Sequence, residues 1–164
     1  LVTVADLDRA AQYNPSSISK NGYAFAIAAI PDADHKAAAY KRIMEDSSLS
    51  NDALTSTANG FLRGDVELRT PYYKLFFDSL LSMWDTRSIG MATRIVRGLY
   101  PRSLYNYGSA EGTGVSDNPS VALAQEWLHK NPSAPSALRR LILEAQDNAH
   151  RNMIGQQFNS SLSD

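Results

Sequence analysis

The side chains most able to do metal or proton chemistry are three histidines, and they are widely separated: His35, His129 and His150. None has a second His at the spacing by which one helix holds a metal ion, and Lys130 follows His129 where an HExxH helix would carry Glu. The sequence also contains 0 Cys, which removes thiolate ligands and thiol nucleophiles. We therefore expect no catalytic residue and no metal ligand in this chain, and we interpret each histidine as structural or solvent-facing.

Serine, carboxylate and glycine residues give no stronger indication of catalysis. There is no G-x-S-x-G, so the serines are interpreted as helix caps and loop residues. Carboxylate pairs such as Glu144 and Asp147 fall on polar helix faces and are better explained as solvated charge. The glycines of "NYGSAEGTGVSDN", residues 106–118, have no preceding strand and no Lys-Ser/Thr ending, so this stretch predicts a flexible loop and not a phosphate site.

Four arginines gather around one predicted helix, in "WDTRSIGMATRIVRGLYPR": Arg87, Arg94, Arg97 and Arg102. The spacing of Arg94 and Arg97 places them as neighbours on a helix surface. Two interpretations stand. The arginines face solvent or pair with nearby acids, or they form a site for an anion or a carboxylate.

Composition limits the classes of protein that fit. The length of 164 residues predicts one domain, 1–164. On folding, a chain of this size buries roughly 68–70% of the surface that the unfolded chain exposes. Lys and Arg number 16 against 17 Asp and Glu, for a net charge of -1, so neither nucleic acid nor a membrane is an expected partner. The absence of cysteine fits the cytoplasm. The chain begins at Leu1 and not at Met, which we interpret as a piece of a longer protein.

Apolar residues recur at helical spacing nearly everywhere, and alternating strand-like runs are lacking. The pattern predicts an all-α fold of about eight antiparallel helices stacked as helical hairpins, in an α-solenoid or HEAT-like array. Ser50 and Ser88 are expected to cap two of the helices, and Ile18 and Ile89 are counted among the apolar stripes. The expected helical segments lie near residues 3–13, 16–30, 31–46, 50–60, 67–84, 88–99, 119–131 and 135–158.

The last helical segment has the clearest apolar stripe. Its members recur at i, i+3, i+4, i+7 and i+11, whereas the charged residues around them lie off the stripe. We expect the stripe to pack into the core, and residues 159–164 to form a disordered tail. The stripe consists of Leu138, Leu141, Ile142, Ala145 and Ala149.

The order of several short motifs resembles a known family. These motifs are "LSN" at 49–51, "PY" at 71–72, W-x-x-R-S at 84–88 and N-P-x-A-P-x-A-L-R-R at 131–140. Together they are similar to the endoplasmic-reticulum-aminopeptidase-like, HEAT-like helical C-terminal domain of actinobacterial-type aminopeptidase N. That family comprises zinc metallopeptidases of the gluzincin aminopeptidase group, and the resemblance covers almost the whole chain.

The resemblance implies a role without catalysis for this chain. In the family, upstream domains bind zinc and the substrate's amino terminus, and neither the G-x-M-E-N nor the HExxH motif occurs here. The chain would be the C-terminal fragment that caps the catalytic cleft and helps control peptide access. Its partners would be the catalytic domain of the parent enzyme and peptide substrates, and zinc would be held in that catalytic domain. Arg87 and Arg94 are the expected peptide-contacting, cavity-facing basic residues.

Two alternatives remain open. The first is a free-standing helical-repeat module that binds other proteins and has no enzymatic activity. The second is an independent hydrolase that uses an unrecognised Ser, Asp or Glu site.

Overall fold

The computed structural model describes residues 3–101 and 118–161, and this part of the chain is all-α, as predicted. The flexible loop expected at 106–118 lies outside the described residues except for Asn118. The last helix continues to Ser161, three residues into the expected tail, and residues 162–164 lie outside the described part. Eight helices occupy the described ranges: α1 (Val4–Tyr13), α2 (Ser17–Ala29), α3 (Ala33–Glu45), α4 (Asn51–Phe61), α5 (Thr70–Thr86), α6 (Ile89–Leu99), α7 (Pro119–Lys130) and α8 (Ser136–Ser161).

Short polar side chains cap the starts of several of these helices. The Ser50 hydroxyl accepts a hydrogen bond from the backbone N–H of Ala53 at 3.2 Å, and Ser88 accepts one from Met91 at 3.4 Å. Both predicted caps are therefore confirmed. Such caps satisfy backbone N–H groups that have no partner within the helix, so the boundaries follow from local sequence.

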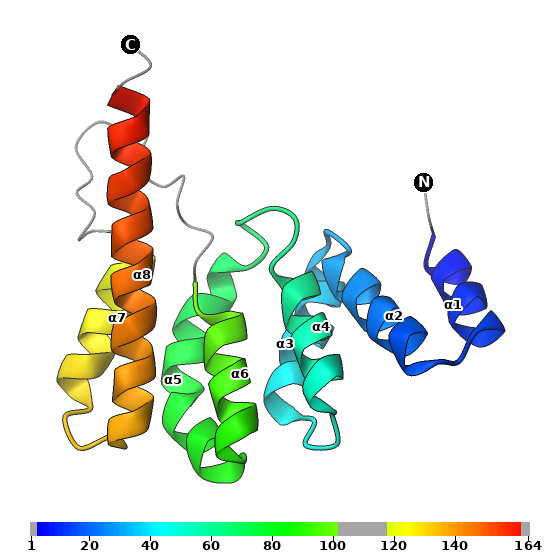
Figure 1. Ribbon diagram of the computed structural model, residues 1–164, viewed down its shortest axis with the longest axis horizontal. Coiled ribbons are helices and arrows are strands. Elements are labelled where there is room, and N and C mark those ends of the chain that lie inside the picture. Colours follow the sequence, from blue (N-terminus) through cyan, green and yellow to red (C-terminus); the bar gives the residue numbers. More distant parts are fainter. Residues whose placement is uncertain (1–2, 102–117, 162–164) are drawn as a thin grey trace.

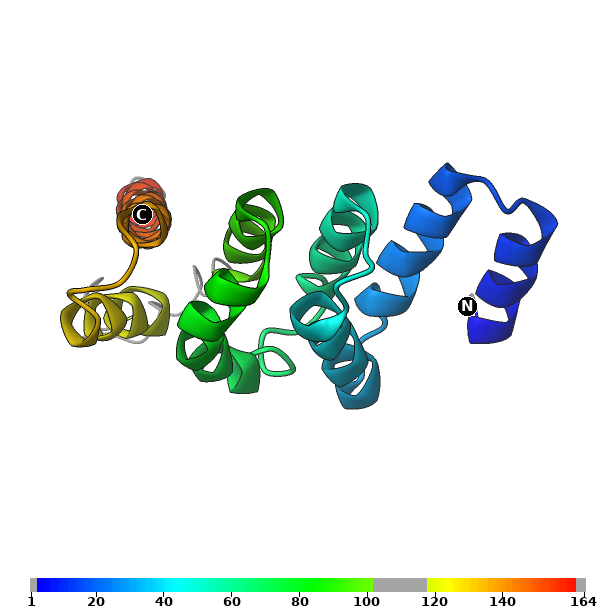
Figure 2. The ribbon, with the colours of Figure 1, turned by 90° about the horizontal axis from the view of Figure 1, so that it is seen from below.

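The helices form four consecutive pairs arranged side by side in one row, with α1 at one end and α7 and α8 at the other (Figure 1 and Figure 2). Within each pair the two helices contact each other. Between pairs, α2 contacts α4, α4 contacts α6, and α6 contacts α8, while α5 contacts α7. The even-numbered helices therefore make one continuous layer. The more specific expectation of a HEAT-like repeat stays a prediction.

The core runs along this row. Leu54 from the second pair, and Leu80 and Ile95 from the third, have no exposed surface. The stripe of the last helix is confirmed as core: Leu138 and Ile142 have none either. For two residues that were expected in the buried stripes, the prediction is wrong. Ile18 and Ile89 are exposed, because each lies in the first turn of its helix, beyond the reach of the neighbouring helices.

Glycines allow the even-numbered helices to approach closely. A Cβ added to Gly60 of α4 would lie 2.2 Å from the carbonyl oxygen of Phe25 in α2, and one added to Gly98 of α6 would lie 2.8 Å from the Cβ of Ala58 in α4. Real Cβ atoms do not make such contacts. Two helix-to-helix interfaces of this layer therefore require a residue without a side chain.

A buried lysine joins the ends of two of these helices. Lys36 of α3 has no exposed surface, and its Nζ donates to the carbonyl oxygen of Ala28 at 2.7 Å and to that of Gly60 at 3.3 Å. These carbonyls lie in the last turns of α2 and α4, where backbone acceptors lack helical partners and the helix dipole favours a cation. Burial lowers the pKa of Lys36 to about 8, and the nearby Arg69 adds to this effect.

Arg69 acts in the same way just beyond the end of α4. Its guanidinium is buried and donates to the carbonyl oxygens of Leu62 and Gly64. Gly64 has a φ of 79°, a conformation that glycine adopts without strain. Burial lowers the pKa of Arg69. Sequence reasoning did not predict that Lys36 and Arg69 are buried. Every residue carries the backbone carbonyl group that binds them, so the pattern of side chains does not indicate where such a contact forms.

Candidate functional site

Arg87, the first of the two predicted basic residues, forms hydrogen bonds with the backbone of two helices. It forms the C-cap of α5, and its backbone N–H donates to the carbonyl oxygen of Met83 at 3.1 Å. Its guanidinium Nη2 donates to the carbonyl oxygen of Met44 in the last turn of α3, at 2.7 Å. Arg87 therefore links the ends of two helices, and its side chain is only half-buried.

Arg94, the second predicted residue, lies on the exposed face of α6. Its Nη1 donates to the carbonyl oxygen of Gly90, one turn earlier in the same helix, at 3.1 Å. Arg97 is also exposed, and Arg102 lies outside the described residues. Neither Arg87 nor Arg94 lines the groove described below. Their expected role in contacting peptide stays a prediction.

The histidines remain apart in the folded chain. Within residues 3–101 and 118–161, no three His, Asp or Glu side chains come together in a way that would hold a metal ion. His35 lies beside Asp32, with 2.6 Å between its Nδ1 and the carboxylate Oδ2. The backbone N–H of His35 also donates to Asp32 and holds the pKa of that carboxyl below its usual value. This pair belongs to the start of α3.

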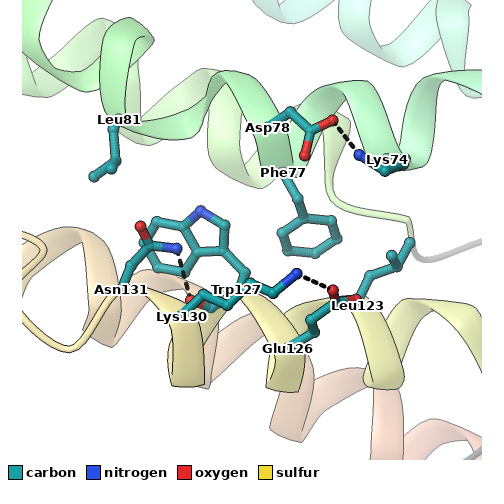
Figure 3. A pocket seen from close by; sticks show the side chains of 9 residues that line it. All are labelled: Lys74, Phe77, Asp78, Leu81, Leu123, Glu126, Trp127, Lys130 and Asn131. Atoms are coloured by element: carbon teal, nitrogen blue, oxygen red, sulfur yellow. Dashed lines mark hydrogen bonds and ion pairs between the residues drawn. The ribbon is translucent and has the colours of Figure 1, made fainter.

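A groove with apolar and charged lining residues lies between α5 and α7 (Figure 3). Its cavity volume is about 300 Å³. Phe77 projects into it from α5 and Trp127 from α7, and both are almost completely buried. Leu81 and Leu123 extend the apolar surface toward solvent. The contact between α5 and α7 therefore leaves an aromatic floor open on one side.

Two ion pairs border this groove, one on each wall. Lys74 donates to Asp78 on α5 at 2.6 Å, and Lys130 donates to Glu126 on α7. The pairs influence each other, because the pKa of Glu126 is lowered first by Lys130 and also by Lys74 across the groove. The pKa of Lys130 is raised by Glu126, with a contribution from Asp78. The rim thus carries two positive and two negative charges that compensate one another.

The groove also contains two side chains that can form further hydrogen bonds, Trp127 and Asn131. The indole nitrogen of Trp127 is turned toward α5, and its N–H has no acceptor within the described ranges (Figure 3). Asn131 donates from Nδ2 to the carbonyl oxygen of Trp127 at 2.8 Å, which leaves its side-chain oxygen as an acceptor. Sequence reasoning missed this site, because its two halves are more than forty residues apart in the chain.

A second, shallower hollow lies between α7 and α8. Leu143 and His150 line it together with the carboxylates of Glu144 and Asp147. Both carboxylates already pair with arginines of the same helix, Arg140 and Arg151. Glu144 and Asp147 are exposed and ion-paired, which agrees with the prediction of solvated charge on this face of α8. In the part of the chain that the structure covers, no helix has the length and apolar character needed to span a bilayer.

Comparison with known proteins relates the chain to an aminopeptidase N. No family model matches the chain. Over 143 residues the chain is 29% identical to a protein named Aminopeptidase N from Streptomyces lividans. The alignment covers 86% of this chain but 15% of that protein, so the chain spans a small part of the relative's length. The chain is therefore similar to one part of an aminopeptidase N.

Proposed function

We propose that this chain is a non-catalytic, C-terminal helical domain of a zinc-dependent aminopeptidase that removes N-terminal residues from peptides. In that enzyme it caps the catalytic cleft and helps control the access of peptides. The observation that carries the proposal is the similarity itself, which runs through 86% of this chain yet only 15% of the aminopeptidase N. We also propose a cytoplasmic location for the parent enzyme, for which the cysteine-free sequence is the support.

Zinc belongs elsewhere in the proposed enzyme. Catalytic zinc sites use three protein ligands and an open position. The described side chains of this chain do not fit such a site, because no three His, Asp or Glu residues converge. We therefore assign zinc to the catalytic domain of the parent enzyme, together with the polarisation of the peptide carbonyl.

The two arginines are the proposed peptide-contacting groups of this domain. Arg94 is exposed and bonded only within its own helix, so its remaining N–H groups are available to a carboxylate or a backbone carbonyl. Arg87 keeps one bond to the end of α3 and is half-buried. We infer that Arg94 contributes more to peptide contact and Arg87 more to the position of the α5–α6 turn.

A comparison of the isolated chain with its parent tests the proposal. Arylamidase activity is measured for the purified chain with added zinc and for the complete gene product under the same conditions. We expect no activity from the chain and activity from the parent that a chelator abolishes. Activity of the chain itself, or chelator-resistant activity of the parent, would contradict the proposal.

A second candidate function is a free-standing helical-repeat module that binds other proteins without enzymatic activity. The groove between α5 and α7 favours it, because an aromatic floor with a polar rim is typical of protein contact sites. The two candidates differ in the gene. A start codon directly before Leu1 with no upstream peptidase domain would favour the module.

A further inference from the structure

We propose that the groove between α5 and α7 binds an uncharged, extended polypeptide segment. A leucine-sized side chain of the segment packs over Phe77, and a backbone carbonyl of the segment accepts the indole N–H of Trp127. The inference rests on α5 and α7 alone, so it holds whether or not the chain is part of an aminopeptidase.

The shape and lining of the groove fit one apolar side chain. A cavity of about 300 Å³ is at the lower limit of ligand pockets in proteins. Its floor is formed by Phe77 and Trp127, which are 4% and 6% exposed, while Leu81 at the mouth is 37% exposed. Burial of an aliphatic side chain against these surfaces would remove apolar area from water on both partners.

Trp127 provides the observation that points to a ligand. More than nine-tenths of this residue is buried, while its indole N–H is not among the buried polar atoms without a partner and so borders the open side of the groove. Within residues 3–101 and 118–161 this N–H has none, and it is turned into the groove (Figure 3). The floor of the groove therefore offers a donor to an incoming acceptor.

Asn131, the C-cap residue of α7, complements that donor. Its Nδ2 is held by the carbonyl oxygen of Trp127, so its side-chain oxygen is oriented as an acceptor at the mouth. An extended polypeptide carries carbonyl and N–H groups in alternation along its backbone. A donor on Trp127 and an acceptor on Asn131 match these two groups.

The charges on the rim determine the class of ligand. Lys74 is paired with Asp78 and Lys130 with Glu126, so no charge on the rim lacks an opposite charge. An anionic ligand such as phosphate would meet Asp78 and Glu126 at short range, and a cationic one would meet the two lysines. Because like charges disfavour both, the rim favours a segment without charged side chains.

A blocked tripeptide tests the inference by nuclear magnetic resonance. The sequence has 2 Trp, so a ¹⁵N-labelled chain gives two indole signals, of which Trp84 is the internal reference. Trp127→Phe assigns the signals. We expect N-acetyl-Ala-Leu-Ala-amide to shift the Trp127 signal saturably, with a Kd in the millimolar range, and to leave Trp84 unmoved. N-acetyl-Ala-Ala-Ala-amide should bind at least about fivefold more weakly, because it buries fewer methylene groups.

Two surface variants locate the site. Leu81→Asp places a carboxylate at the mouth of the groove and should weaken the leucine peptide at least about fivefold, since that charge must be desolvated. Leu143→Asp, on the exposed face of α8, is the matched control and should leave the affinity unchanged. The inference is overturned if the Trp127 signal does not move, if both peptides shift it equally, if Leu81→Asp binds like the unchanged chain, or if inorganic phosphate shifts it in place of the peptide.

Discussion

The Nζ atom of Lys36 lies 2.7 Å from the carbonyl oxygen of Ala28 and so connects α3 to the last turn of α2. The same ammonium group reaches Gly60 at the end of α4. One cation therefore satisfies backbone acceptors of two helices that also contact each other directly. No carboxylate pairs with it among the ion pairs of the described residues. Its protonation should consequently be coupled to the stability of the fold.

Lys36 should make stability rise with pH between about pH 8 and pH 10.5. Its pKa is about 8 in the folded chain against an ordinary value of 10.5, so in this window the unfolded chain binds more protons than the folded chain. The free energy of unfolding should increase by up to about 2 kcal/mol between pH 7.5 and pH 9.5. Urea denaturation at several pH values in this range measures it.

Lys36→Met should remove this rise, because no ammonium group is then buried. Lys41→Met, at an exposed position of the same helix, is the control and should keep it. The range stops at pH 9.5 because of Tyr40. Burial raises the pKa of Tyr40 to about 12, and its contribution is lost as pH rises from 10 toward that value. Equal slopes for Lys36→Met and the unchanged chain would contradict the assignment.

Gly60→Ala should destabilise the chain by about 1–3 kcal/mol or more, because the new methyl group would overlap the Phe25 carbonyl oxygen at 2.2 Å. Gly22→Ala is a matched control within α2, where a Cβ meets nothing within 4 Å. The control should instead stabilise by about 0.5–1 kcal/mol, since alanine is the better helix former. Thermal unfolding followed by circular dichroism distinguishes the two signs. The same sign for both variants would show that the α2–α4 interface adjusts.

Ile142→Ala should cost about 2–5 kcal/mol, because Ile142 has no exposed surface and its truncation leaves a cavity. Leu143→Ala, one residue later and 48% exposed, should cost less than about 1 kcal/mol. Denaturant midpoints of the two variants provide the test. Neither substitution should change any activity of the parent enzyme. Similar losses at both positions would mean that α8 presents a different face to the core.

Arg87→Ala combined with Arg94→Ala, made in the proposed parent enzyme, should raise KM for long peptides more than KM for an amino-acid arylamide. On the proposed placement of this domain the arylamide would be too short to reach it, so only the longer substrate would lose a contact. Arg97→Ala, on an exposed position of the same helix, is the control and should alter neither value. Equal effects on both substrates would contradict a role in peptide contact. Because Arg87 also bonds to Met44, the melting temperature of each variant is measured alongside.

The sequence by itself determined the helices and most of their boundaries. Helical spacing of apolar residues and caps such as Ser50 and Ser88 act within one or two turns, so they can be read from neighbouring letters. The stripe of α8 was recognised in the same way. The lack of metal-ligand spacing was equally a local property of the chain.

Only the tertiary structure decided which helices meet and what their contacts leave exposed. Lys36 and Gly60 are 24 positions apart, and the bond between them depends on carbonyl groups that every residue carries. The groove likewise arises because α5 packs beside α7, which brings Phe77 opposite Trp127. Such pairings depend on the packing of whole helices, and the spacing of residues along one helix does not encode them.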